Sequence, residues 1–378
     1  MKKLVLSLAI VASIFTSCSD DDSKDNGPVV PTEEILSGNI TADRTLSKNT
    51  IYTIQGPVYV KPGVTLTIPA GTHLEGDADF GQVAVLAIEK GAKINAQGTA
   101  SEPIVFTSNS ATPAPGDWGG IVICGNALTN LGTNVQAEVT GLTYGGTNAA
   151  DNSGTLSYVV VEYAGALINE NAEFNGVTFY AVGSQTKVDN IFVYQGSDDA
   201  FEWFGGSVNA TNLIAIGNQD DSFDWTEGWN GTVTNLYSDQ SSALTFSSDS
   251  RGIEADSNQA NPTTAPISNP TLSNITLIGR NNGAVTSEAG IMLRRGTQGN
   301  ISNVFIKDFQ GSGSAAIKFD GAESQAWFKA HPVTGVQVTN VLANTNTFDG
   351  SETALNIVTS STGAGNGAAL PTWADWTK

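Results

Sequence analysis

Two segments of the chain repeat each other at a fixed offset, and this period limits the possible folds more than any other feature. Residues 197–203, Ser-Asp-Asp-Ala-Phe-Glu-Trp, align with residues 219–225, Gln-Asp-Asp-Ser-Phe-Asp-Trp, at an offset of 22 (220 - 198), and Asn190-Ile191 aligns with Asn212-Leu213 at the same offset. A period in the low twenties, built of short strands broken by Gly, Asn and Asp, is typical of a solenoid whose coils stack as parallel sheets. The sequence therefore predicts a coil of about three strands per turn.

A short apolar strand with an Asn at its entrance recurs along the second half of the chain. The six copies begin at Asn190, Asn212, Asn235, Asn274, Asn303 and Asn340. An Asn at one corner of successive coils can hydrogen-bond the side chain of the next Asn, so we expect a ladder of Asn side chains. A leucine-rich solenoid has a similar period but needs regularly spaced Leu, which this chain lacks. A β-sandwich remains the competing fold.

Residues 49–108 show the same alternation, with apolar strands separated by Pro-Gly, Pro-Ala-Gly and Lys-Gly turns, as expected for the opening coils. The 41 glycines and the low charged fraction of 14% favour strands and turns over helices. The predicted fold is all-β: a single-stranded right-handed parallel β-helix with lateral loops over residues 35–378. Residues 256–270 are expected to form one such loop. The course of residues 109–151 and the coil register between 234 and 270 stay open.

Residues 1–34 have the layout of an export signal followed by a tether. Two lysines precede an apolar run from Leu4 to Phe15, which is too short for a span of ~20 helical residues. The small residues ahead of Cys18 resemble the lipobox of bacterial lipoproteins, in which the cysteine is lipidated and becomes the first mature residue. We expect a signal peptide over 1–17, a lipid on Cys18, and a flexible acidic tether over 18–34.

Four strings resemble the surface-exposed β-helix lipoproteins of Bacteroidota. They are residues 63–72, 96–108, 118–122 and 158–165, of which the first reads Gly-Val-Thr-Leu-Thr-Ile-Pro-Ala-Gly-Thr. The resemblance covers nearly all of 35–378. It implies a pectin-lyase-like β-helix on the outer membrane, facing the cell exterior, and the acids after the lipidated cysteine resemble the surface-export signal of that group. Members are often labelled multidrug transporters, which a chain without an apolar span after Phe15 does not support.

The net charge of -20 argues against binding nucleic acid or anionic lipid surfaces and favours cations and neutral or basic partners.

Cys124 has no disulfide partner if Cys18 carries lipid, and its apolar surroundings predict a buried structural thiol. His73 and His331 lack the spacing of metal ligands.

Acids alternate with aromatic residues in both copies of the repeat. If the rings point into the coil the acids point out, and extending this register gives an outward column of Glu202, Asp224, Glu254, Met292 and Lys318. Carboxylates on adjacent coils, ~5 Å apart, repel one another unless a cation lies between them, and oxygen ligands suit calcium. The alternative is a solvated acidic edge whose Asp residues form turns. The candidate calcium ligands are Asp198, Asp199, Glu202, Asp220, Asp221 and Asp224.

Two classes of function remain open. The preferred one is a non-catalytic surface lipoprotein that binds a glycan, a nutrient or an outer-membrane partner, with calcium as structural support; an adhesin-like structural protein differs only in its partner. Trp229, between Gly228 and Asn230, is expected to be exposed and able to stack on a sugar. The alternative is a β-helix polysaccharide lyase or hydrolase that uses the Glu202, Asp224 and Glu254 face. Its candidate catalytic residues are Glu254, Arg294 and Lys318.

Overall fold

The computed structural model of the chain describes residues 31–139, 141–170, 172–281 and 286–378. The predicted signal peptide, Cys18 and most of the predicted tether lie outside the described residues. Within the described part of the chain, no helix is long and apolar enough to cross a membrane.

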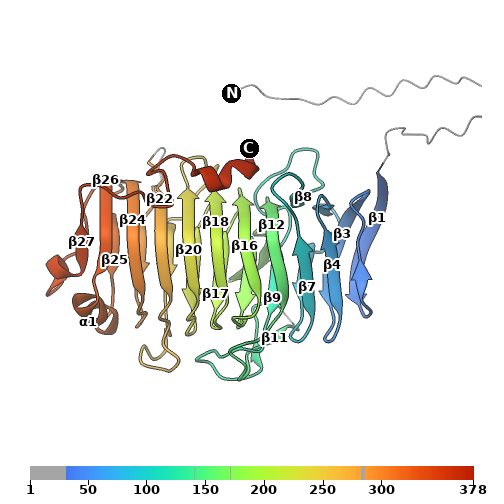
Figure 1. The fold of residues 1–378 in the computed structure, drawn as a ribbon, viewed down its shortest axis with the longest axis horizontal. Helices are drawn as coiled ribbons and strands as arrows, with labels where there is room; N and C mark the ends of the chain where they lie inside the picture. The colour runs from blue at the N-terminus through green and yellow to red at the C-terminus, as the bar shows by residue number, and fades with distance from the viewer. Residues whose placement is uncertain (1–30, 140, 171, 282–285) are drawn as a thin grey trace, which may run out of the picture. The chain divides into compact units, whose positions relative to one another are not determined.

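The segment Pro31–Lys378 is a parallel β-helix in which one continuous sheet of 23 strands winds through successive coils (Figure 1). From residue 154 onward each coil contains one long, bent strand and one short strand. The long strands are β12 (Gly154–Glu162), β16 (Lys187–Tyr194), β18 (Asn209–Ile216), β20 (Thr232–Asp239), β22 (Thr271–Ile278), β24 (Asn300–Phe309) and β26 (Val333–Val341). The short strands are β15 (Val177–Tyr180), β17 (Phe201–Phe204), β19 (Phe223–Thr226), β21 (Arg251–Ala255), β23 (Ala289–Leu293) and β25 (Ala315–Phe319).

The opening coils follow the same path with more, shorter strands. Here β7 and β8 pair separately with the two halves of β12, so each coil presents three strand segments, as the period predicted. These strands are β1 (Thr32–Ile40), β2 (Arg44–Thr45), β3 (Thr50–Val60), β4 (Thr65–Pro69), β5 (His73–Gly76), β6 (Val85–Ile88), β7 (Lys93–Gln97), β8 (Ile104–Ser108) and β9 (Ile121–Cys124). Because β1 begins at Thr32, three residues expected in the tether belong to the first strand.

Each long strand bends at a residue with positive φ, and in β16, β18, β20, β22 and β24 this residue is the predicted Asn, with φ between 53° and 66°. Strands β24 and β26 each have a second residue with positive φ, Asp308 and Asn340. Asn tolerates this left-handed conformation better than most side chains. The Asn ladder is confirmed, because each amide from Asn212 onward donates to the Asn side-chain oxygen one coil earlier at 2.7–2.9 Å. The ladder runs through Asn190, Asn212, Asn235, Asn274 and Asn303.

The sixth predicted rung is wrong. In β26 the corner residue is Gly335, with φ 64°, because Thr334 pairs with Ser302 of β24. Asn340 lies near the end of the strand, where its side chain donates to Asp308 instead. An Asn followed by apolar residues marks both a corner and a strand end, so the sequence pattern alone does not separate them.

The interior is a stack of aromatic and aliphatic side chains. The rings of Phe179 and Trp203 stack at 5.7 Å and those of Phe201 and Phe223 at 5.6 Å, which confirms the inward direction predicted for the aromatic residues. Cys124 is also buried as predicted, and burial raises the pKa of its thiol to about 12.

The expectation that Trp229 is exposed is wrong. Its side chain is fully buried, its rings lie 4.7 Å from those of Trp203, and its Nε1 donates to the Val208 carbonyl oxygen at 3.3 Å. The flanking Gly228 and Asn230 instead allow a tight turn, where Gly228 packs against the Pro266 backbone. Trp229 is therefore a core residue and not a sugar-stacking platform.

Lateral insertions explain the two stretches left open by the sequence. Between 109 and 151, β9 stays in the solenoid between β6 and β15, and the following residues run outside it through a small hairpin of β10 (Val135–Gln136) and β11 (Thr143–Tyr144). Further on, Thr234 pairs with Ser273 of the next coil. The offset between adjacent coils is therefore 39 here (273 - 234), against 22 earlier (212 - 190), because a lateral loop is inserted between the two strands.

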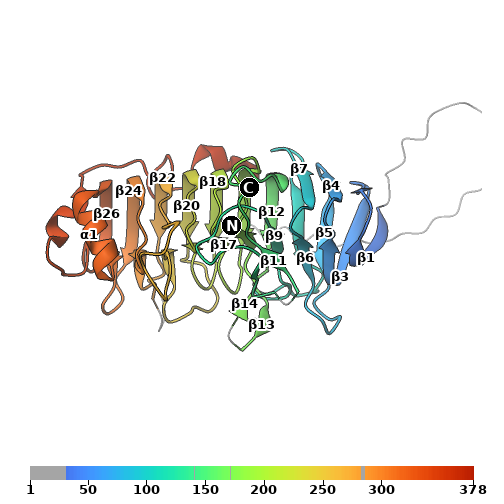
Figure 2. The same ribbon diagram turned by 90° about the horizontal axis from the view of Figure 1, so that it is seen from below.

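A second hairpin, β13 (Leu167–Asn169) with β14 (Ala172–Glu173), projects from the coils (Figure 2). At the C-terminal end, α1 (Ala322–Ala330) packs Phe328 against Phe319 of the interior. The remaining elements are η1 (Ser351–Thr353), β27 (Leu355–Ile357) and η2 (Thr372–Thr377), of which η2 lies across the outer face of the long strands.

Candidate cation-binding pocket

The short strands place the predicted column of outward side chains in register. Glu202 of β17 pairs with Asp224 of β19, and Asp224 pairs with Glu254 of β21. The column continues through Met292 to Lys318. The predicted column is therefore confirmed, although the offset is 22 (224 - 202) at its first step and 30 (254 - 224) at its second.

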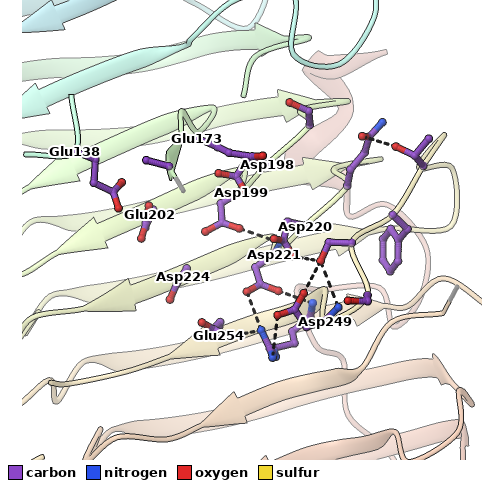
Figure 3. A pocket seen from close by; sticks show the side chains of 18 of the residues that line it. Glu138, Glu173, Asp198, Asp199, Glu202, Asp220, Asp221, Asp224, Asp249 and Glu254 are labelled. Atoms are coloured by element: carbon purple, nitrogen blue, oxygen red, sulfur yellow. Dashed lines mark hydrogen bonds and ion pairs between the residues drawn. The ribbon is translucent and has the colours of Figure 1, made fainter. Parts of the chain in front are cut away.

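A pocket of about 930 Å³ lies over the acidic part of this column. Its floor is formed by β17, β19 and β21 with the corners that precede them, and lateral segments form its sides (Figure 3). One guanidinium, that of Arg251, lines it beside eleven carboxylates. The acids are Glu138, Glu170, Glu173, Asp198, Asp199, Glu202, Asp220, Asp221, Asp224, Asp249 and Glu254.

Seven of these carboxylates form three overlapping triplets. In each triplet, one oxygen per residue lies within 4.8 Å of the others. We name them by position: the corner triplet precedes the strands, the floor triplet lies at their centre, and the arginine triplet lies on the side of β21. The corner triplet is Asp198, Asp199 and Asp220; the floor triplet is Asp199, Glu202 and Asp224; the arginine triplet is Asp221, Asp224 and Glu254.

The arginine triplet has its own counter-charges. Arg251 Nη1 lies 3.6 Å from Asp221 Oδ2 and forms an ion pair with Glu254. Arg294 forms a second ion pair with Glu254 and donates from Nε to Asp256 Oδ1 at 2.8 Å. Since all of these groups are largely buried, their charges are compensated inside the protein.

The floor triplet shares Asp224 with the arginine triplet but has no ion pair of its own. Within the described residues, no Lys or Arg forms an ion pair with Asp199, Glu202 or Asp224. Asn175, which is 2% exposed, donates its amide to Glu202 Oε2 at 2.6 Å, and the Asp221 backbone N–H donates to Asp199 Oδ1 at 2.9 Å. Asn175 Oδ1 and Asp224 Oδ1 are both buried without a hydrogen-bond donor. Buried oxygens without donors are the feature that a bound cation satisfies.

The pKa values of the pocket acids reflect this lack of compensation. Burial, followed by repulsion from neighbouring carboxylates, raises the pKa values of Asp199, Glu202 and Asp224 well above their ordinary range. The same causes raise the pKa of Asp198 to about 8, and burial raises that of Asp220 to about 6. The cation-free pocket therefore retains protons near neutral pH, and a bound cation would displace them.

The structure brings two of the three candidate catalytic residues together, because Arg294 forms an ion pair with Glu254, but it leaves only Glu254 in the pocket lining. Glu254 lines the pocket, whereas Arg294 and Lys318 do not, and the ammonium group of Lys318 is paired with Glu288 at 2.9 Å. Arg251 is the residue that sequence reasoning missed, although its position three residues before Glu254 could have indicated an ion pair.

Asn175 and the acids of the lateral hairpins were also missed. The hairpins leave the repeat, so no periodicity places Glu138 or Glu173 beside the column.

Residues 38–377 match the family model of the pectate-lyase-like β-helix domain. The chain belongs to this family. None of the curated proteins compared with it is similar enough to count as a match. Among solved structures, the catalytic unit of a thermostable GH87 alpha-1,3-glucanase from Streptomyces thermodiastaticus strain HF3-3 is 12% identical with a TM-score of 0.36. That match covers 87% of this chain and 65% of the glucanase chain, and the family assignment rests on the family model alone.

Proposed function

We propose that this member of the pectate-lyase-like β-helix family is a surface-anchored, non-catalytic binding protein that holds a calcium ion at the floor of its acidic pocket. The observation that carries the proposal is the floor triplet of Asp199, Glu202 and Asp224. It combines three carboxylates without an ion-pair partner among the described residues and one buried oxygen without a donor, Asp224 Oδ1.

The donor set fits calcium better than other common metals. All the available groups are carboxylate oxygens, and no Cys or His belongs to any triplet. Calcium accepts six to eight oxygens in variable geometry, whereas magnesium demands a near-ideal octahedron. The pocket opens to solvent, so water or a ligand oxygen can complete the coordination.

The pairing of the basic side chains argues against a lyase. A lyase of the kind considered above needs an Arg or Lys that can take up a proton from a uronate. Arg294 is held by Glu254 and Asp256, and Lys318 by Glu288, so neither side chain is free to contact a uronate in the pocket.

A hydrolase is the second candidate, favoured by a different observation. Glycoside hydrolases need one carboxyl group that stays protonated near neutral pH to act as a general acid. Asp198, with a pKa near 8, meets this requirement in the absence of a cation, and Asp220 is the adjacent carboxylate.

Titration of the purified chain with calcium and with magnesium, followed by calorimetry, tests the calcium site. We expect calcium to bind to the wild type and to bind much more weakly to Glu202→Gln and Asp224→Asn. Glu323→Gln, an exposed change on α1, is the matched control and should bind as the wild type does. Equal heats for all four proteins would refute the site.

Turnover assays separate binding from catalysis. The wild type is incubated with polyuronates and neutral glycans, with calcium and with chelator, and we expect no product. Product that disappears in Glu254→Gln or Arg294→Ala would replace our proposal with the lyase. Product that disappears in Asp198→Asn would replace it with the hydrolase.

The anchoring part of the proposal rests on Cys18 and its resemblance to a lipobox. Membrane fractionation of cells should recover the wild type with the outer membrane and Cys18→Ser in the soluble fraction. Protease added to intact cells should digest the wild type. Protection from the protease would refute surface exposure.

A further inference from the structure

We propose that the two lateral hairpins over the acidic pocket bind a lysine- or arginine-bearing segment of a partner protein. The inference deepens the proposed function and rests on it for the floor cation. The contact surface is the hairpin wall, which we define as Glu138 between β10 and β11, and Glu170 and Glu173 of the β13–β14 hairpin.

The hairpin wall carries charge that the floor cation does not need. None of its three acids belongs to a carboxylate triplet, and none forms an ion pair with a described Lys or Arg. Among the described residues, the side chain that donates to Glu138 is Tyr180, whose hydroxyl lies 3.3 Å away, and Glu170 is exposed. One calcium ion and the Arg251 guanidinium together offset three charges of the eleven acids lining the pocket. The pocket with its cation bound therefore stays formally negative.

This residual charge selects the sign of the ligand. A polyuronate brings further carboxylates and would face the hairpin wall with like charge, at a cost that rises as water is excluded. Ammonium and guanidinium groups supply donors and opposite charge together.

Apolar side chains at the rim favour a polypeptide over a small inorganic cation. Leu167, which is 62% exposed, lies in the hairpin that carries Glu170 and Glu173. Leu244, which is 63% exposed, precedes the pocket-lining segment Thr245–Asp249. The stems of Lys and Arg are apolar and lie along such surfaces while their charged ends reach acids. The lining Phe246 ring already has Arg280 5.2 Å from its centroid, so this rim accepts a guanidinium.

The probe for this inference is a fluorescein-labelled pentalysine peptide, added to the purified full chain with Cys18→Ser in saturating calcium and physiological salt. Anisotropy gives its Kd. The triple variant Glu138→Gln, Glu170→Gln and Glu173→Gln should bind pentalysine about tenfold more weakly, since exposed ion pairs contribute ~0.2–1 kcal/mol each. Its calcium affinity should fall much less than that of Glu202→Gln, because no wall residue belongs to a triplet and Glu138 acts on Glu202 only through space.

A second triple variant controls for the overall negative charge. Asp79→Asn, Glu323→Gln and Glu352→Gln remove the same number of charges at exposed positions outside the pocket, and pentalysine affinity should change by less than about twofold. Equal weakening in both triple variants would overturn the proposal, and so would tighter binding of a labelled penta-galacturonate than of pentalysine.

The two proposals fail in distinguishable ways. Calcium binding without wall-dependent pentalysine binding would overturn this inference and leave the calcium site in place. Wall-dependent pentalysine binding in a protein that binds no calcium would overturn the calcium site and support the hairpin wall.

Discussion

Replacing Glu202 by Gln should stabilise the protein in chelator and destabilise it in calcium, each relative to the wild type. The change removes one negative charge from the floor triplet while keeping the size of the side chain. The Gln oxygen can still accept the Asn175 amide that Glu202 accepts at 2.6 Å. The sign of the change in stability therefore reports the loss of a charge and not a change in packing.

The expected size follows from the spacing of the triplet. Its carboxylate oxygens lie within 4.8 Å of one another, and two unit charges at that distance repel by about 3.5 kcal/mol at an effective dielectric constant of ~20. Protonation relieves part of this repulsion, because burial and the neighbouring acids raise the pKa of Glu202. We expect a net gain of about 1–2 kcal/mol in the free energy of unfolding at pH 8 in chelator.

Calcium should reverse the order. At a calcium concentration of about a hundred times Kd, binding stabilises the wild type by about 2.7 kcal/mol, and a weaker site in Glu202→Gln receives much less. The assay is thermal unfolding of the wild type, Glu202→Gln and the control Glu323→Gln in chelator and in calcium. A Glu202→Gln protein that is less stable than the wild type in chelator, or that gains as much from calcium, would refute the reasoning.

Three further predictions concern the charge and the core. In chelator, the free energy of unfolding should fall as pH rises from about 4 to about 8, because the folded pKa of Asp198 is about 8 against 3.8 for the free side chain, so the folded state binds more protons. A profile that is flat or rises over this range would contradict the pocket electrostatics. Trp229→Ala should cost about 3–5 kcal/mol in denaturant unfolding, because it removes a fully buried ring. A loss below about 1 kcal/mol would mean that Trp229 is not a core residue. Asn235→Ala should destabilise more than Asn235→Gly, by about 1 kcal/mol, since both lose the ladder bonds to Asn212 and Asn274 but only Gly fits φ 66° without strain. Equal melting temperatures for these two variants would show that the ladder bonds alone set the cost.

Most of the solenoid follows from local pattern. The repeat offset placed Glu202 beside Asp224. The alternation along the strand predicted that Phe201 and Trp203 point into the coil and that Glu202 points out of it. Both predictions depend on strand geometry alone, in which successive side chains alternate and equivalent positions of adjacent coils pair. The Asn ladder followed for the same reason and failed at Asn340, which is in register with Asp308 and not with Asn303.

The sequence by itself determined the β-helix, the inward aromatic residues and the acidic column, because each is a property of a repeat read one coil at a time. Only the tertiary structure decided which acids are compensated. The ion pair between Arg294 and Glu254 and the position of the hairpin acids at the pocket join segments that insertions separate by distances the repeat does not set. Charge compensation depends on distances between segments far apart in the chain, and a local pattern does not encode those distances.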